Sequence, residues 1–178
     1  MHSSFKPVEN ADIVQPVDID GKIQYVYVLK RPHCEEFVAR MSLHYEIVMF
    51  TASLSKYAEP LYAKLDKEGV TANNLYREHC TFYNGLFVKD MARLGRPMSD
   101  IIILDNSPTA YAFQPENGMP ILSWYEEKDD TKLFELIPVL KLMAEIEDVR
   151  PVLLECTTRD NKFNCDKAVR LCETIISK

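Results

Sequence analysis

Apolar and polar positions alternate in two parts of this chain, each interrupted by a turn signal. Residues 13–30 alternate on both sides of an Asp-Gly pair at 20–21, and residues 80–89 alternate on both sides of an Asn-Gly pair at 84–85. Both dipeptides favour the two-residue turns that join antiparallel strands, because they accept the positive φ angles that such turns need. The pattern therefore predicts two β-hairpins.

Three other segments have apolar positions at helical spacing. The first covers residues 32–41, opens on a proline and has acidic residues in its first turn, where the helix dipole favours them. The second covers residues 54–68, and we expect Pro60 to break or restart it. The third covers residues 131–147 and follows Asp130, which can cap its first turn.

Short apolar runs between these segments predict buried strands. They lie at residues 45–50, 74–79, 100–105 and 120–124. Helices that alternate with buried strands indicate an α/β fold with a mostly parallel sheet. Ligands of such sheets bind beyond the carboxyl ends of the strands. The residues that follow 45–50 and 100–105 are therefore the first candidates for a functional site.

Polar side chains that could bind a ligand or take part in catalysis follow both of these strands. Thr51 and Ser53 offer hydroxyls at a strand-to-helix turn whose free N–H groups suit a phosphate, although Ser53 alone is typical of a helix N-cap. Asp105 and Asn106 carry oxygen donors that suit Mg²⁺, or they form an Asx-turn that ends the strand. Lys89, which leaves the second hairpin, is either a phosphate clamp or a solvated surface lysine.

Composition narrows the class of protein. The chain has 178 residues, a length that fits one domain. Its net charge of −6 argues against direct binding of nucleic acid, which requires a basic surface. It has no apolar run long enough for a membrane span, and residues 1–10 lack the pattern of a secretory signal. Its five cysteines are widely spaced, which indicates reduced thiols of the cytosol or nucleus.

Several short motifs together resemble one known family. They are HSSFKPV, VYVLKRPH, FTASLSKYAEP, LYREHC, VKDMARLGR and ILDNSP, in this order along the chain. The chain resembles the small phosphatases that act on the carboxy-terminal domain of RNA polymerase II, which belong to the haloacid dehalogenase superfamily. The resemblance covers residues 1–149 and implies a Rossmann-like fold with a β-hairpin insertion. Residues 150–178 are an extension whose role the resemblance does not indicate.

The resemblance implies a phosphate site. By position in the family motifs, Thr51 holds phosphoryl oxygens, Lys89 neutralises the phosphate, and Asp105 fixes that lysine. Asn106 resembles a direct Mg²⁺ ligand, and Arg77 resembles a further contact to a phosphopeptide. The family reaction passes through an aspartyl-phosphate, with Mg²⁺ as cofactor.

The resemblance also implies a peptide pocket beside the insertion hairpin. In the family, an apolar pocket receives a proline next to the phosphoserine, and proline rings suit aromatic walls. From the residues alone, ordinary hairpin packing explains the same side chains. The implied partners are phosphorylated Ser-Pro peptides of RNA polymerase II or of other nuclear phosphoproteins, which places the protein in the nucleus, with the cytoplasm as the alternative. The residues that match the pocket lining are Phe5, Val17, Ile19, Val26, Leu54 and Tyr57.

One family motif is missing from the sequence. The family nucleophile lies in an Asp-x-Asp-x-Thr strand just before the stretch that matches residues 2–5, and no such motif occurs in the chain. The acids at 18–20 have the right spacing but lie in a hairpin turn. We therefore expect an N-terminally truncated domain without its central strand, inactive as it stands, and unstable, aggregation-prone or repacked because buried backbone groups lose their partners.

Three functions remain open at this point. The sequence can be part of a Mg²⁺-dependent protein serine/threonine phosphatase. It can be a non-catalytic isoform or pseudophosphatase that binds phosphopeptides without hydrolysing them. A third alternative is an interaction subunit, since membrane-anchored mitochondrial import proteins share this domain, although no membrane or transit segment supports it.

Overall fold

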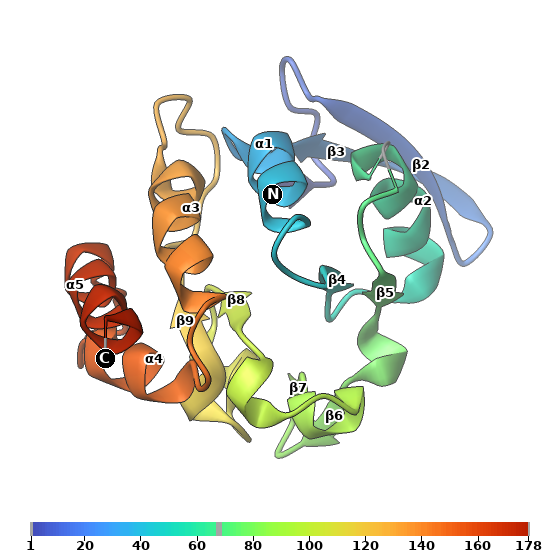
Figure 1. The fold of residues 1–178 in the computed structure, drawn as a ribbon. Coiled ribbons are helices and arrows are strands. Elements are labelled where there is room, and N and C mark those ends of the chain that lie inside the picture. The colour runs from blue at the N-terminus through green and yellow to red at the C-terminus, as the bar shows by residue number, and fades with distance from the viewer. Residues whose placement is uncertain (1, 67–68, 178) are drawn as a thin grey trace. The chain divides into compact units, whose positions relative to one another are not determined.

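The computed structural model describes residues 2–66 and 69–177. Figure 1 shows the helices and strands along the chain, which divides into two compact units. The first unit comprises Met1–Glu78 and Trp124–Leu133, and the second comprises His79–Ser123 and Phe134–Lys178. No helix in the described ranges has both the length and the apolar character needed to cross a bilayer.

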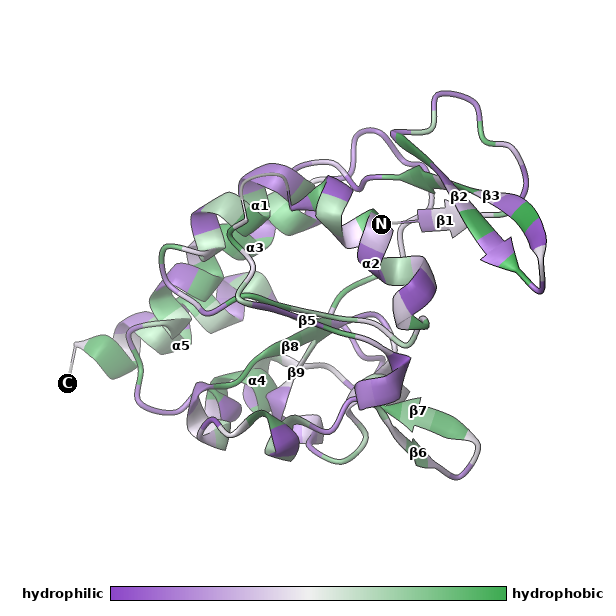
Figure 2. Ribbon diagram, turned by 90° about the vertical axis from the view of Figure 1, so that its right-hand side faces the viewer, coloured by the Kyte–Doolittle hydropathy of each residue, from purple (hydrophilic) through white to green (hydrophobic). Residues whose placement is uncertain are grey.

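An antiparallel sheet dominates the first unit. Its strands are β1 (His2–Ser4), β2 (Ile13–Ile19) and β3 (Lys22–Leu29), in the order β1-β3-β2. Residues 20 and 21 have φ angles of 52° and 78°, so the Asp-Gly pair makes the predicted turn. Hydrophilic and hydrophobic residues both occur along β2 and β3 (Figure 2), as expected for a hairpin with one packed face. The first hairpin is thus confirmed, whereas β1 was not predicted.

A small helical and parallel part completes the first unit. Helix α1 (Cys34–Met41) and helix α2 (Ser55–Leu65) flank strand β4 (Val48–Phe50), which pairs in parallel with β5 (Asn73–Leu75). A one-turn 3₁₀ helix follows at Arg77–His79. Two apolar clusters hold α2 in place. The first packs α2 against the hairpin, and its buried members are Ile13, Val28 and Leu61. The second packs α2 against Tyr76, and its other buried members are Ala58 and Tyr62.

The prediction that Pro60 breaks the second helix is wrong. Helix α2 runs from Ser55 to Leu65 with Pro60 inside it. Proline removes one N–H···O=C bond to the residue four positions earlier, but the buried residues Ala58, Leu61 and Tyr62 anchor the helix on both sides of it. The predicted end of this helix at residue 68 lies outside the described residues.

The described residues of the second unit form two short sheets, three helices and several 3₁₀ turns. Strands β6 (Thr81–Tyr83) and β7 (Leu86–Val88) form the second predicted hairpin, which turns at Asn84 and Gly85 with φ angles of 48° and 80°. Strands β8 (Ile103–Asp105) and β9 (Gly118–Pro120) pair in parallel. The 3₁₀ turns are Met91–Leu94, Met98–Asp100, Pro108–Tyr111 and Pro115–Asn117, and the helices are α3 (Lys132–Met143), most of which lies in this unit, α4 (Arg150–Cys156) and α5 (Cys165–Ile176).

The parallel strands are shorter than predicted, and one lies elsewhere. The run at 120–124 was predicted as a strand, but β9 covers 118–120 and ends where the prediction begins. The run at 74–79 gives strand only to residue 75 and then a 3₁₀ turn. Residues 45–47 and 100–102 are likewise outside the strands that follow them. Hydrophobicity located these segments, whereas backbone pairing decided their bounds.

Each parallel sheet has two strands. Strand β4 pairs with β5 and β8 pairs with β9, and within the described residues neither β4 nor β8 has a second ladder partner. The α/β class is confirmed.

The extension after residue 150 is a helical hairpin. Helices α4 and α5 are joined through a bridge between Thr157 and Phe163, and the side chain of Asn164 caps α5 by accepting the Lys167 N–H at 2.9 Å. Cys156 and Cys172 are both buried within this hairpin. None of the five cysteines, which all lie in the described ranges, forms a disulfide.

Position 118 in β9 has no room for a side chain, because the ring of Tyr111 lies against it. A Cβ added at this position would overlap the ring of Tyr111, which is itself buried. We expect Gly118→Ala to lower the free energy of unfolding by about 1–3 kcal/mol, because a buried ring must shift to relieve the overlap. Denaturant unfolding measures this loss. In a Tyr111→Leu background the same substitution should cost little; an equal cost in both backgrounds would show that the ring is not responsible.

Candidate active site

The second unit brings two of the predicted residues into direct contact. Lys89 follows β7, Asp105 ends β8, and Lys89 Nζ lies 2.5 Å from Asp105 Oδ2. Each side chain is only 11% exposed. The backbone N–H of Lys89 also donates to the Ala110 carbonyl at 2.7 Å, which fixes the lysine at its base. Lys89 is therefore a buried, carboxylate-paired lysine, and the alternative of a solvated surface lysine is wrong.

The second oxygen of Asp105 stabilises the turn that follows β8. Its Oδ1 accepts the Ser107 N–H at 2.8 Å, which is the Asx-turn that the sequence also predicted. Both interpretations of Asp105 hold together, because each carboxylate oxygen serves one of them. The pairing places the Lys89 ammonium at the carboxyl end of a parallel strand, where α/β proteins bind their ligands.

Asn106 lies next to this pair and is exposed. Its amide nitrogen donates to Ser123 Oγ at 2.9 Å, so the amide is oriented with its oxygen as the remaining acceptor. Within residues 2–66 and 69–177, no three His, Cys, Asp or Glu side chains gather closely enough to hold a metal ion. Magnesium prefers about six oxygen ligands and usually one or two carboxylates. The role of Asn106 as a magnesium ligand stays a prediction.

Thr51 belongs to the first unit and directly follows β4. Its N–H donates to the Leu75 carbonyl at 2.9 Å, and its Oγ1 accepts the Ser53 N–H at 3.1 Å. The Thr51 side chain is also hydrogen-bonded to Tyr62. Burial raises the pKa of Tyr62 to about 12, so this phenol stays protonated at neutral pH. The hydroxyl of Thr51 is thus held in a defined position at the end of the strand.

The start of α2 differs from the prediction. Leu54, not Ser53, is the N-cap residue, and it makes no side-chain cap. The carboxylate of Glu78 takes this place: it accepts the Ser55 N–H at 3.1 Å and the Ser55 hydroxyl at 2.8 Å. The expectation of free N–H groups here is therefore wrong for Ser55. Sequence reasoning missed Glu78 because 23 residues separate it from its partner.

Arg77 is attached to the turn after β4. Its Nε donates to the Ala52 carbonyl at 2.6 Å, and its backbone N–H donates to the Ser53 carbonyl at 2.9 Å. The first unit thus gathers Thr51 and Arg77 around one strand end, as the second unit gathers Lys89, Asp105 and Asn106 around another.

The residues predicted to line a peptide pocket all lie in the first unit. Strand register places Val17, Ile19 and Val26 on one face of the β2–β3 hairpin. Val26 packs against the cluster that includes Leu61, so ordinary hairpin packing accounts for it. Phe5 is 59% exposed, although it is large and apolar. Leu54 and Tyr57 lie at the start of α2. A peptide-binding role for this set stays a prediction.

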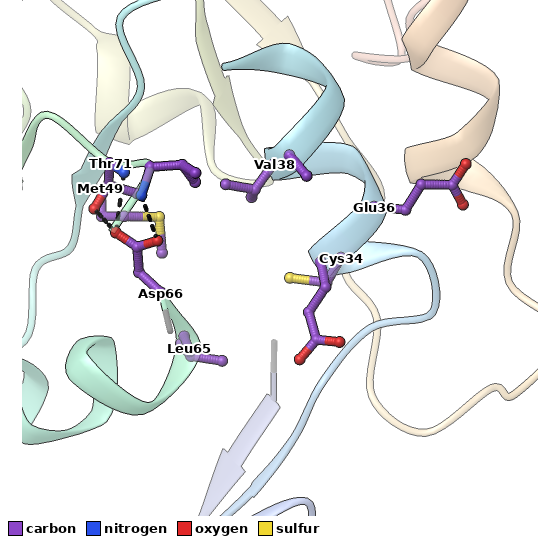
Figure 3. A pocket seen from close by; sticks show the side chains of 10 residues that line it. Cys34, Glu36, Val38, Met49, Leu65, Asp66 and Thr71 are labelled. Carbon is purple, nitrogen blue, oxygen red and sulfur yellow. Dashed lines mark hydrogen bonds between the residues drawn. The ribbon is translucent and has the colours of Figure 1, made fainter. Parts of the chain in front are cut away.

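A cavity in the same unit was not predicted. It measures about 430 Å³ and is lined by apolar side chains, among them Val38, Met49 and Leu65. The Cys34 side chain also points toward it, and Asp66 on its rim is hydrogen-bonded to Thr71 (Figure 3). Burial raises the pKa of the Cys34 thiol, so it is a poor nucleophile at neutral pH.

Comparison with known proteins identifies the family. The profile of the family described as NLI interacting factor-like phosphatase matches residues 1–150. The chain therefore belongs to the NLI interacting factor-like phosphatase family, which confirms the resemblance to small carboxy-terminal-domain phosphatases.

Individual relatives agree with this assignment. The human CTD small phosphatase-like protein is 52% identical over 153 residues, which cover 86% of this chain and 55% of that protein. The human carboxy-terminal domain RNA polymerase II polypeptide A small phosphatase 1 is 50% identical over 153 residues, which cover 86% of this chain and 59% of that protein. The chain thus spans less than two thirds of the length of these relatives.

Solved structures confirm the fold. A structure of the fission yeast RNA polymerase II CTD phosphatase Fcp1 matches 93% of this chain and 52% of its own, with a TM-score of 0.56 at 14% identity. The likeness bears out the haloacid dehalogenase fold class.

Proposed function

We propose that the protein containing these 178 residues is a protein serine/threonine phosphatase for phospho-Ser-Pro sites in the C-terminal domain of RNA polymerase II, acting in the nucleus. The observation that carries the proposal is the buried Lys89–Asp105 pair at the end of β8. The substrate class is supported by the two human relatives that are about 50% identical, since one of them is a small phosphatase named for the carboxy-terminal domain of RNA polymerase II.

The residues of this chain would bind and orient the substrate. The ammonium of Lys89, held by Asp105, neutralises charge on the phosphoryl oxygens. By family resemblance alone, the proposal also assigns Thr51 to a phosphoryl oxygen and Arg77 to the phosphopeptide. The pocket lined by Phe5, Tyr57 and their neighbours receives the proline. Mg²⁺ dependence is part of the proposal by family resemblance, with Asn106 as its assigned ligand.

Residues 1–178 alone should not hydrolyse phosphate esters, because they contain no Asp-x-Asp-x-Thr motif. Fusion of the corresponding strand of a human relative in front of Met1 should raise hydrolysis of a phospho-Ser-Pro peptide by at least about 10³-fold, the scale on which nucleophiles contribute. Phosphate release with and without Mg²⁺ measures the effect. The matched control is the same fusion with its first aspartate replaced by asparagine. Hydrolysis by residues 1–178 that depends on Lys89 would contradict the proposal.

The second candidate is a phosphopeptide-binding protein that does not hydrolyse its ligand. It is supported by the Lys89–Asp105 pair, because a buried lysine can bind a phosphate without a nucleophile beside it. Calorimetry separates the two candidates: binding of a phospho-Ser-Pro peptide by the longest natural form of the protein, without phosphate release in Mg²⁺, would support this candidate over the enzyme.

A further inference from the structure

The β6–β7 hairpin exposes an unusual number of large apolar side chains. Phe82 is 65% exposed, Tyr83 54%, Leu86 46% and Phe87 37%. These four residues flank a two-residue turn, so they lie within one short hairpin. Figure 2 shows β7 as a hydrophobic strand. Apolar side chains gathered in this way on a protein surface commonly mark an interaction site.

The aromatic rings of this hairpin are held in a fixed arrangement. Phe82 and Phe87 are register partners, and their ring centroids lie 5.1 Å apart at an interplanar angle of 51°. On the other face, the ring of Tyr83 packs edge-on against Phe113 at 5.3 Å. Because one face is fixed by packing, the phenylalanine pair on the opposite face is preorganised, which lowers the entropy cost of binding.

Positive charge lies next to this pair. Residues 79–97 contain three basic residues, of which Lys89 is buried and paired with Asp105, and a single acid, Asp90, although the whole chain has a net charge of −6. Asp90 is engaged by the Ala92 N–H and by the Gln114 amide. Arg93 is exposed, and its Nη1 donates to the His79 carbonyl at 3.5 Å, which places it beside the chain that enters β6. His79 is three residues before Phe82, a span of about 10 Å along an extended chain.

An aromatic pair with an arginine at this spacing fits one class of ligand. Proline rings pack on aromatic faces, and an arginine guanidinium binds phosphate through two hydrogen bonds. An extended peptide of three or four residues is about as long as the chain segment from His79 to Phe82. A phosphorylated Ser-Pro segment carries both groups and the negative charge that complements Arg93.

We propose that Phe82, Phe87 and Arg93, here called the hairpin surface, bind a second phosphorylated Ser-Pro segment of the same substrate polypeptide. This inference rests on the proposed function, because it takes its ligand from there. Two binding surfaces on one protein make the second binding event intramolecular, so a substrate with repeated segments is retained far longer than one with a single segment.

Fluorescence anisotropy with labelled peptides tests the inference, using the full chain with a chelator present so that no phosphate is released. One peptide carries a single phosphorylated Ser-Pro segment, and the other carries three, joined by flexible spacers. We expect the three-segment peptide to bind at least about tenfold more tightly. The double variant F82S/F87S, and separately Arg93→Glu, should lose this gain while binding the single-segment peptide as before. Leu154→Ser, at an apolar position of α4 that is 60% exposed, is the matched control and should keep the gain.

The outcomes distinguish this inference from the proposed function. If the single-segment peptide binds but the gain is absent, or survives both hairpin changes, the hairpin surface is not a second site and the proposed function stands. If no phosphorylated peptide binds the unaltered chain, the proposed function fails and this inference fails with it. Sedimentation of the chain provides a further check: a dimer that F82S/F87S dissociates would make the hairpin a self-association surface and overturn the inference.

Discussion

Lys89→Met is expected to lower the free energy of unfolding by about 3–5 kcal/mol. In the fusion that carries the nucleophile strand of a human relative, it is also expected to abolish phosphatase activity. The substitution leaves the carboxylate of Asp105, which is 11% exposed, without its cationic partner. Removing one member of a buried ion pair costs this much because the other charge stays buried and uncompensated. Under the proposed function, the same ammonium stabilises the phosphoryl group, so turnover is lost as well.

A second substitution separates the two effects. In Lys89→Met/Asp105→Asn the buried charge is gone, while the Asn oxygen can still accept the Ser107 N–H. Stability should therefore recover in part, whereas activity should not. Denaturant unfolding and release of phosphate from nitrophenyl phosphate measure the two quantities. Full activity in the single variant would remove Lys89 from the reaction.

Asp130→Asn is the second substitution with a large expected effect, again about 3–5 kcal/mol of unfolding free energy. Arg31 donates to both oxygens of Asp130, from Nε at 2.6 Å and from Nη2 at 2.8 Å, and the two side chains are 6% and 14% exposed. Asparagine removes the negative charge that faces this buried guanidinium at both of its hydrogen bonds. Asp148→Asn is the matched control, because Arg150 binds Asp148 with the same fork geometry at a more exposed site; it should cost only about 0–1 kcal/mol.

The Asp130 effect should depend on pH. The hydrogen bond from Arg31 lowers the pKa of Asp130 below its ordinary value of 3.8. A carboxyl whose pKa is lower in the folded state binds protons more readily when unfolded, so its stabilisation is fully present above pH 3.8 and is lost as the pH falls through the folded-state pKa. The stability difference between the unaltered chain and Asp130→Asn should therefore shrink below about pH 4. A difference that stays constant from pH 7 to pH 3 would show that Asp130 does not titrate in this way.

Local sequence signals predicted the parts of the fold that depend on local chemistry. Both hairpins turn where Asp-Gly and Asn-Gly stand, because these dipeptides accept positive φ angles regardless of their surroundings. Asp130 was predicted to cap a helix, and it does accept the Lys132 N–H at 3.3 Å. Its stronger interaction with Arg31 was not predicted, since 99 residues separate the two.

The parts of the site that depend on contacts between distant residues were harder to predict from the sequence. By itself, the sequence around Lys89 favours a surface lysine, and only its contact with Asp105, 16 residues away, shows that it is buried. Pro60 was expected to break a helix, but packing of its neighbours outweighs one lost hydrogen bond. Glu78 at the start of α2 has no local signal at all. The family resemblance compensated for this at Lys89 and Asp105, because matching motifs carry information about distant contacts.

The brevity of the parallel strands has a further consequence. β4 and β8 are three residues long, whereas strands in globular proteins average five or six. Each outer edge therefore presents only one or two backbone groups with which the strand of another molecule could pair. Two such edges offer little surface for strand pairing between copies. The lack of a second ladder partner for β4 and β8 among the described residues therefore need not cause aggregation.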